Sequence, residues 1–372
     1  MGLLGWRLVT RDAWRSVLAM AGIAVAVLIA FVEMGFMNGV LDSQVRVVEA
    51  ARGELVVLDK RRVHLDKWDS LLPIRLPQIA GLPGVAAVLP LYQAGVNLRS
   101  GIDQPDKRLI LLAFSPDAPP LELGLDQATL ALLREPNTVL FDRKSRPIYG
   151  DLAVGQDVWV EGRRLRLGGF ASLGPTLLID GALIASESTL RTFVPMDRPV
   201  MAVIRVAPGA DIERVKQTIL GLAGEDLDVF RPGELADREI TYLRRAAPIG
   251  LLFGAGMTAG LFVGLVICYQ VLYVAIRRRI QAFATLKAMG FSNGFVIGTI
   301  VQQAVLYASG GFLMGLAGAY FLYQELALRT GLAILFTAPR IGAIALACLL
   351  ASVLAGLAAS RQVVDCEPAD LY

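Results

Sequence analysis

Four long stretches that are almost free of charge constrain the fold of this chain more than any other feature of its 372 residues. Ser16–Val40 carries one charged residue, Glu33, and Ala246–Ile276, Phe291–Gln324 and Ile341–Ser360 carry none. Each is long enough to cross a bilayer as a helix, which takes roughly 20 residues. The hydrophobic share of 55% also exceeds that of an ordinary soluble domain. We therefore predict transmembrane helices at 16–40, 246–276, 292–324 and 341–360.

The first stretch has an alternative interpretation as a signal peptide. Its apolar run exceeds the roughly 7 to 15 residues of such segments, and no convincing cleavage site follows, so we favour a retained helix. Basic residues flank the helices at Arg7, Arg11 and Arg15, in 277–290, and at Arg361. The positive-inside rule then predicts a cytoplasmic N-terminal segment (1–15), a short external loop (325–340) and a cytoplasmic tail (361–372) of a multi-pass protein in the cell inner membrane.

This topology places residues 41–245 outside the cytoplasm as one periplasmic domain. The insertion holds 26 Lys/Arg and 27 Asp/Glu, so its charge balance gives no reason to expect nucleic acid as a partner. We predict strands where β-branched residues cluster or where apolar and polar residues alternate. Asp211 is typical of an N-cap, and the helix that we predict after it has Ile212, Val215, Ile219 and Leu222 on one face. The predicted strands are Glu54–Asp59, Ala86–Arg99, Arg108–Ser115, Thr138–Asp142, Asp157–Phe170, Met201–Val206 and Leu227–Phe230. The fold class is thus a four-span helical bundle with an inserted α+β domain.

Two helical segments connect this domain to the membrane. Asp42–Arg52 and Glu234–Arg245 contain few turn residues, and we predict that they directly continue the first and second spans. We interpret them as stalks that carry motion, slightly ahead of ordinary juxtamembrane helices.

Residues 277–291, between the second and third spans, form the most informative short segment. It contains Arg277, Arg278, Arg279 and Lys287 but no acid, and its composition favours a helix that Gly290 can stop. Phe283, Leu286 and Met289 follow at three-residue spacing, which predicts an apolar strip with a basic rim, together with Gln281. Such a helix suits the groove of a cytoplasmic partner, and from these residues alone it suits an anionic lipid surface equally well.

Small residues recur inside the spans. Gly256, Gly260 and Gly264 are spaced by four residues in the second span, and Gly311 and Gly315 likewise in the third. This spacing lets helices approach closely, either within one subunit or between two copies, and we favour the dimer.

Glu33 is the one ionisable side chain inside a predicted span, which makes it a functional candidate. Its place near the outer end equally fits an interfacial carboxylate.

Catalytic and metal motifs are missing from the sequence. It has no Walker-type phosphate loop, no His-Glu-x-x-His and no paired cysteine motif. Its single histidine, His64, lies in a charged stretch without partner ligands, and we expect a surface imidazole, with no metal site and no catalytic residues. Cys268 and Cys348 lie in spans and Cys366 in the tail, which excludes a disulfide framework in the inserted domain.

Ala284-Thr285-Leu286-Lys287-Ala288-Met289-Gly290, directly after a span, resembles the coupling motif of FtsX-like and MacB-like ABC transporter permeases, and the topology is similar too. Further motifs resemble the DevC subfamily: Gly22–Ala26, Met34–Phe36, Pro90–Tyr92, Leu140–Pro147 and Tyr269–Tyr273. Two positions depart from that subfamily, which usually has an acid at Gln281 and a neutral polar residue at Glu33. With Gln281 the chain lacks the carboxylate that would contact the ATPase at this position. A role of Glu33 would be particular to this chain and not general to the subfamily.

The resemblance implies a homodimeric permease that works with a separate ABC ATPase, which binds ATP and Mg, so that this chain carries no cofactor. It implies that ATP-driven motion reaches the periplasmic domain, which acts with a membrane fusion protein and an outer-membrane channel to export a lipid or other amphiphile. Two further classes stay open. One is an FtsX-like regulator of a periplasmic cell-wall hydrolase, which a copurifying hydrolase would favour, and the other is a membrane-anchored enzyme, for which the sequence offers no catalytic set.

Overall fold

A computed structural model describes residues 13–62, 64–65, 71, 75–101, 104–176, 179–194, 198–224, 226–246, 249–330 and 336–364. The chain divides into two compact units. The first, the helical unit, comprises residues 1–38, 248–326 and 334–372. The second, the mixed unit, comprises 39–247 and 327–333.

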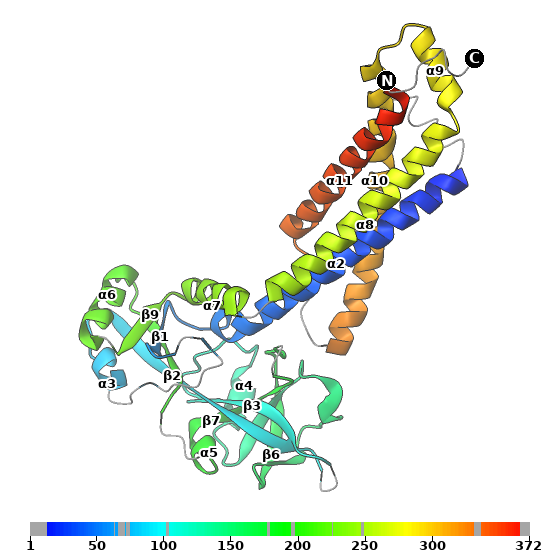
Figure 1. Cartoon of the computed structure of the whole chain (residues 1–372). Helices are drawn as coiled ribbons and strands as arrows, with labels where there is room; N and C mark the ends of the chain where they lie inside the picture. Colours follow the sequence, from blue (N-terminus) through cyan, green and yellow to red (C-terminus); the bar gives the residue numbers. More distant parts are fainter. Residues whose placement is uncertain are drawn as a thin grey trace. The chain divides into compact units, whose positions relative to one another are not determined.

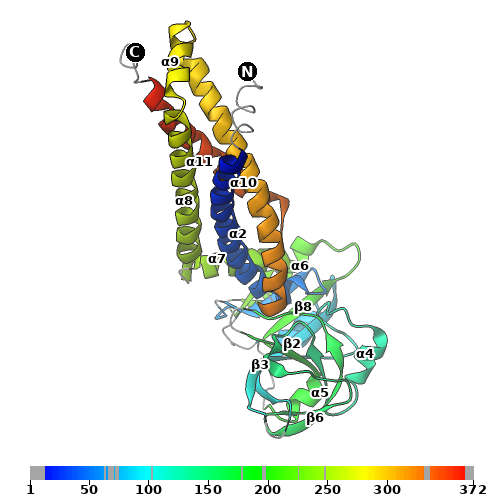
Figure 2. The ribbon, with the colours of Figure 1, turned by 90° about the vertical axis from the view of Figure 1, so that its right-hand side faces the viewer.

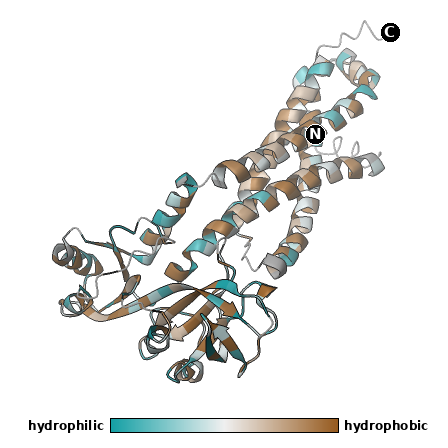
Figure 3. Cartoon of the chain, turned by 60° about the horizontal axis from the view of Figure 1, so that its bottom comes forward, coloured by the Kyte–Doolittle hydropathy of each residue, from teal (hydrophilic) through white to brown (hydrophobic). Residues whose placement is uncertain are grey.

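Among the residues that the structure describes, four helices are long and apolar enough to cross a membrane, as predicted, and they form most of the helical unit. They are α2 (Ala13–Glu49), α8 (Ile249–Arg277), α10 (Asn293–Thr330) and α11 (Ala338–Val364), and the short α9 (Ile280–Ala288) lies between α8 and α10 (Figure 1). Hydrophobic residues cover much of the long helices (Figure 3). In the most apolar 18-residue stretch of α8, however, only 11% is buried inside the protein. Apolar helices that the protein itself leaves uncovered fit a lipid environment.

The mixed unit contains a nine-stranded sheet in the order β3-β7-β4-β6-β5-β2-β8-β1-β9. An additional pairing between β2 and β3 closes six of these strands into a ring. The strands are β1 (Leu55–Asp59), β2 (Val85–Arg99), β3 (Lys107–Phe114), β4 (Thr138–Asp142), β5 (Asp157–Val160), β6 (Arg163–Ala171), β7 (Ala182–Ser186), β8 (Met201–Val206) and β9 (Leu227–Phe230). The helices are α3 (Arg75–Ala80), α4 (Gln127–Leu132), α5 (Glu187–Arg191), α6 (Ile212–Ala223) and α7 (Pro232–Ala246), with a 3-10 turn at Pro147–Tyr149.

Strand β2 belongs to both parts of this sheet. Its first half, from Val85 to Leu91, pairs with β8, and its second half, from Tyr92 to Leu98, pairs with β3. Strands β8, β1 and β9 continue from that first half as a four-stranded antiparallel layer. One long strand therefore joins the ring to the layer.

Alternating side chains fill separate cores, because neighbouring residues of a strand point to opposite faces. Tyr92, Ala94, Val96 and Leu98 of β2 enter the core of the ring. A second core lies under α3 and α6 and includes Ile79, Val215 and Ile219 with residues of β1 and β8. A third contains Val48 of α2 and Leu235 of α7 together with strand residues such as Leu91 and Ile110.

Most strand predictions are confirmed, and one needs correction. Asp157–Phe170 is not one strand but the hairpin of β5 and β6. Glu161 and Gly162 both have positive φ, 48° and 75°, which fits the two-residue turn that suits the twist of a hairpin. The sequence analysis also missed β7, whose five residues are all buried and thus show no alternation.

The helix that Asp211 was predicted to begin is present as α6. The Asp211 carboxylate accepts a hydrogen bond from the backbone N–H of Glu213 at 2.9 Å. Val215 and Ile219 are buried as expected, but Leu222 is exposed. Capping chemistry thus located the start of this helix correctly.

Of the two stalk segments, the first is the C-terminal end of α2, which is one helix to Glu49. The second is α7, which ends at Ala246, whereas α8 begins at Ile249. The junction between this stalk and the second span falls at residues 247–248, outside the described residues, so the prediction that the stalk directly continues the span stays a prediction.

Candidate coupling elements

Helix α9 ends at Gly290 through two backbone hydrogen bonds. The N–H of Gly290 donates to the carbonyl of Lys287 at 3.0 Å, and the N–H of Phe291 donates to the carbonyl of Leu286 at 3.1 Å. This is the Schellman pattern, which needs a residue with positive φ after the helix, and Gly290 has a φ of 90°. The last glycine of the predicted segment thus stops the helix.

The apolar strip of α9 is divided between two faces. Phe283 and Ala284 are buried, Leu286 is half-buried, and Met289 is 62% exposed. Gln281, Ala282 and Thr285 are also exposed. Phe283 therefore anchors α9 to its own chain, and the face open to a partner is centred on Gln281, Ala282, Thr285 and Met289.

The basic residues of this segment have different environments. The Lys287 ammonium donates to the carbonyl of Val363, in the last turn of α11, at 3.1 Å, where a cation favours the negative end of a helix. The Arg277 guanidinium lies 5.7 Å from the centre of the Tyr273 ring. Arg278 and Arg279 line a groove of the helical unit. The four basic residues therefore do not form one continuous basic surface for a partner.

All five glycines of the two spacing motifs lie against α2 of the same chain. A Cβ on Gly256 would lie 2.5 Å from a carboxylate oxygen of Glu33, and one on Gly264 would lie 2.8 Å from Ala26. A Cβ on Gly260 would meet Ile29 at 3.0 Å, and on α10 one on Gly311 would meet Ile23 at 2.7 Å and one on Gly315 would meet Val27 at 2.8 Å. Figure 2 shows α2 between α8 and α10. The structure thus uses these glycines for packing within one subunit.

Glu33 takes part in this packing. Its side chain is half-buried and covers Gly256, so the glycine leaves the space that the carboxylate fills. Glu33 and Gly256, which are far apart in the sequence, are thus two sides of one packing contact.

The stalk end of α2 is attached to a loop that Asp142 organises. One oxygen of the Asp142 carboxylate accepts hydrogen bonds from the N–H groups of Leu173 at 2.9 Å and Lys144 at 3.1 Å, and the other accepts from Gly174 at 2.7 Å. Arg46 of α2 donates to the carbonyl of Pro175, in the same loop, at 3.2 Å. Gly174 has a φ of 101°, and a Cβ there would meet the Arg46 guanidinium. Asp142 belongs to the motif Leu140–Pro147, whose position in space the sequence did not show.

The remaining motif residues hold the neighbouring strand. Arg146 forms an ion pair with Asp180, and the Ser145 hydroxyl accepts from the N–H of Ala182 at 3.3 Å. The Tyr149 hydroxyl donates to the carbonyl of Arg108 at 2.8 Å, and burial raises its pKa above the ordinary value. The motif, together with Tyr149 two residues after it, therefore ties β3, β4 and β7 of the ring together near the attachment of α2.

The other stalk, α7, is attached to the four-stranded layer through buried charged groups. Glu239 accepts a hydrogen bond from the N–H of Leu65 at 3.0 Å. Arg62, which is 1% exposed, donates to the carbonyl of Val200 at 2.8 Å, and Arg238 donates to the carbonyl of Arg62 at 2.6 Å. No sequence motif indicated these contacts. The polar anchors of α2 and α7 thus reach different parts of the sheet.

The single histidine, His64, lies beside α7. The His64 ring stacks on Tyr242 with ring centres 4.9 Å apart. The described residues contain no group of three or more His, Cys, Asp or Glu that could hold a metal ion.

The fold and these elements define a class: a multi-pass membrane protein with a mixed α/β domain inserted after its first span and a short helix between its second and third. Residues 16–222 match the family profile of the MacB-like periplasmic core domain, and residues 254–368 match that of the FtsX-like permease C-terminal region. The chain belongs to this family of FtsX-like and MacB-like permeases of ABC systems, which are proteins of the inner membrane.

Several solved structures resemble about half of the chain. The periplasmic region of MacB from Actinobacillus actinomycetemcomitans is 13% identical, with a TM-score of 0.38, over 50% of this chain and 92% of that one. The extracellular domain of the noncanonic ABC-type transporter YknZ from Gram-positive bacteria is 13% identical, with a TM-score of 0.35, over 48% and 98%. A domain of a putative permease from Porphyromonas gingivalis is 16% identical, with a TM-score of 0.33, over 47% and 88%. No curated protein matches the chain.

Proposed function

We propose that this chain is a DevC-type permease subunit that transmits ATP-driven motion from a separate cytoplasmic ATPase to its periplasmic unit. Two copies act together, and the motion drives export of a lipid or other amphiphile through a membrane fusion protein and an outer-membrane channel. Both termini and α9 lie in the cytoplasm. ATP and Mg bind to the partner ATPase, and this chain is not itself an enzyme.

The observation that carries this proposal is the two-sided character of α9. Buried Phe283 and Ala284, together with the Lys287 contact to Val363, fix the helix to its own chain. The opposite face presents Gln281, Ala282, Thr285 and Met289 to a partner. A force applied to the exposed face is passed to α11, because a helix anchored by packing moves with the helix it contacts, and to α8 and α10 through the chain itself.

The stalk attachments support the second half of the proposal. Helix α2 has 37 residues and no break, so it spans about 55 Å as a single rod. Its end is fixed at Arg46 by the loop that Asp142 organises, and α7 is fixed at Arg238 and Glu239. Movement of either helix end is thus passed to the sheet through hydrogen bonds and not through loose linkers.

The exposed face of α9 also suggests how the ATPase is recognised. Position 281 carries a neutral glutamine on this face, where the DevC resemblance leads one to expect an acid. We propose a contact dominated by packing around Met289 and Ala282, with hydrogen bonds from Gln281. The homodimer of the proposal uses surfaces other than the five glycines, since α2 covers them.

The test is a mild-detergent purification of the tagged chain with identification of copurifying proteins and measurement of ATPase activity. Met289→Asp places a charge on the exposed face of α9 and is expected to abolish ATPase recovery while the chain stays inserted in the membrane. Val154→Asp is the matched control, because Val154 is 61% exposed and lies in the mixed unit. Recovery of an ATPase and a fusion protein that depends on Met289 supports the exporter.

Other outcomes redirect the proposal. An ATPase recovered together with a cell-wall hydrolase would favour the FtsX-like regulator. An ATPase recovered equally well with Met289→Asp would remove the exposed face of α9 from the contact, and no ATPase at all would refute coupling.

A further inference from the structure

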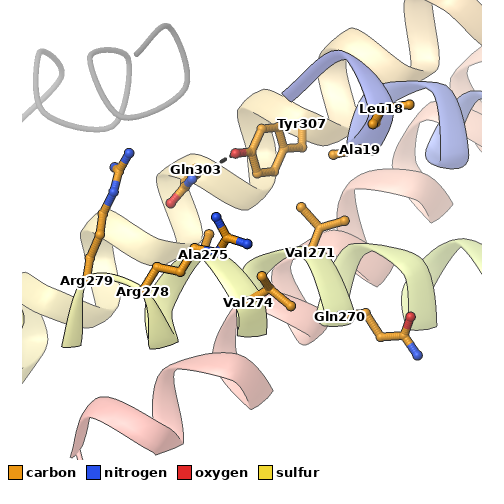
Figure 4. Close-up of a pocket in the computed structure, with 10 residues that line it drawn as sticks. All are labelled: Leu18, Ala19, Gln270, Val271, Val274, Ala275, Arg278, Arg279, Gln303 and Tyr307. Carbon is orange, nitrogen blue, oxygen red and sulfur yellow. Dashed lines mark hydrogen bonds between the residues drawn. The ribbon is translucent and has the colours of Figure 1, made fainter. Parts of the chain in front are cut away.

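A groove in the helical unit runs along α2, α8 and α10 beside the start of α9. Its volume is about 360 Å³, and ten residues line it: Leu18, Ala19, Gln270, Val271, Val274, Ala275, Arg278, Arg279, Gln303 and Tyr307 (Figure 4). This volume lies at the lower end of the roughly 300–1,000 Å³ of ligand pockets. The coupling function proposed above does not use this groove.

The groove has a charged end and an apolar wall. Val271 and Val274 lie on one side of α8, because residues three to four apart share a helix face. Arg278 directly follows the helix, and its backbone N–H donates to the carbonyl of Val274 at 3.2 Å. Figure 4 shows Arg278 and Arg279 toward one end and Leu18 and Gln270 toward the other. A ligand that fits has an anionic head and an apolar body.

The back of the groove is a buried polar wall that holds itself together. The Gln303 amide donates to the Tyr307 hydroxyl at 2.9 Å, and the Ser16 and Tyr307 hydroxyls are 3.5 Å apart. Gln303 and Tyr307 are both buried. The two guanidiniums therefore supply the charge of the site, and none of its ten described lining residues is an acid.

The composition of the groove decides between kinds of occupant. A soluble phosphate would use the guanidiniums but would leave Leu18 and Val274, which are 53% and 48% exposed, without a partner. An uncharged chain would use the wall but not the arginines. A phospholipid with an anionic headgroup uses both, and basic pockets between transmembrane helices on the cytoplasmic side are suited to such headgroups.

We infer that this groove binds an anionic phospholipid of the leaflet next to α9, with its phosphate at Arg278 and Arg279 and the start of an acyl chain along Leu18, Val271 and Val274. Guanidinium groups suit phosphate because their planar N–H donors match its oxygens. The identity of the leaflet rests on the orientation proposed above, whereas binding itself does not depend on ATPase coupling.

The experiment measures lipid binding to the full-length chain, stripped of lipid in mild detergent, by native mass spectrometry. Phosphatidylglycerol is titrated against phosphatidylethanolamine with the same acyl chains. We expect preferential phosphatidylglycerol binding that Arg278→Gln/Arg279→Gln weakens roughly 30-fold, about fivefold for each cation near a phosphate. Arg277→Gln is the matched control, since Arg277 packs on Tyr273 and does not line the groove.

A second pair of variants tests the apolar wall without changing charge. Val274→Trp fills the groove and is expected to lower phosphatidylglycerol binding, whereas Val263→Trp is not. Val263 is the control because it lies on the same helix, is also 48% exposed and does not line the groove.

Several outcomes would overturn the inference. Equal binding of the two lipids would mean ordinary lipid solvation only. A loss of binding as large in Arg277→Gln as in the double variant would mean an effect of net charge. Unchanged binding in Val274→Trp, or full competition by glycerol phosphate, would exclude a lipid seated in the groove. These readouts are independent of ATPase recovery, so failure here leaves the coupling proposal to its own test.

Discussion

Asp142 offers the sharpest test of how the periplasmic unit is attached to α2. The side chain is 0% exposed, and its two oxygens accept three backbone hydrogen bonds in total. In Asp142→Ala the N–H groups of Leu173 and Gly174 lose their acceptors. A buried donor left without a partner costs about 1–3 kcal/mol, so we expect a total loss of about 3 kcal/mol.

Asp142→Asn gives a graded comparison. The amide keeps one oxygen, which can serve Leu173 and Lys144, whose N–H groups share one carboxylate oxygen in the structure. The bond from Gly174 is lost, which costs about 1.5 kcal/mol. For a unit of about 200 residues each kcal/mol lowers the unfolding midpoint by about 2–4 °C, so the expected shifts are about 9 °C for alanine and about 4 °C for asparagine.

The assay is thermal unfolding of the full chain in detergent, followed by tryptophan fluorescence, to which Trp159 in β5 contributes, and by limited proteolysis of the mixed unit. Asp106→Ala is the control, because Asp106 is exposed and surface substitutions usually change stability by less than about 0.5 kcal/mol. Midpoints of the alanine and asparagine variants within 1 °C of the wild type would refute the assigned role of Asp142. A shift of equal size in the control would do so as well.

Two further predictions concern the helical unit. Gly256→Ala is expected to lower the thermal midpoint of the chain in detergent, because the added methyl meets Glu33 and overpacking costs about 1–3 kcal/mol. Gly250→Ala is the control, because open space surrounds Gly250 and its midpoint is expected to stay unchanged. Equal midpoints of the two variants would contradict the packing of α8 against α2. Phe283→Ala is expected to destabilise α9 by about 3 kcal/mol and to increase its hydrogen exchange, whereas Phe291→Ala, at a site 42% exposed, has a small effect; the reverse order would mean that Phe283 faces outward.

Local chemistry explains what could be predicted from the sequence. A continuous apolar stretch of 20 or more residues is helical in a bilayer, since a helix satisfies the hydrogen bonds of its backbone within the stretch itself. The cap at Asp211 and the stop at Gly290 depend on their own side chain or φ angle, and both are found as expected. The FtsX-like and MacB-like resemblance also followed from contiguous motifs.

Other features depend on contacts between residues far apart in the chain, and the sequence does not reveal these contacts. The spacing of Phe283, Leu286 and Met289 predicted one strip, but whether a side chain of α9 is buried depends on the helices beside it. The strand β7 is short and buried throughout, and Ile184 is its one β-branched residue, so it carries neither alternation nor the β-branched run that indicated β1 and β4. The glycine spacing indicated close packing but could not identify α2 as the partner.

The sequence by itself thus determined the four spans, the inserted α+β domain and the short helix after the second span, because hydrophobicity, charge and capping act over a few neighbouring residues. The tertiary structure decided which face of α9 is open, that Glu33 fills the space at Gly256, and that Arg46 meets the loop organised by Asp142. It also brought Arg278 and Arg279 to the groove beside Leu18. These contacts join residues far apart in the chain, and only packing in three dimensions sets their distances.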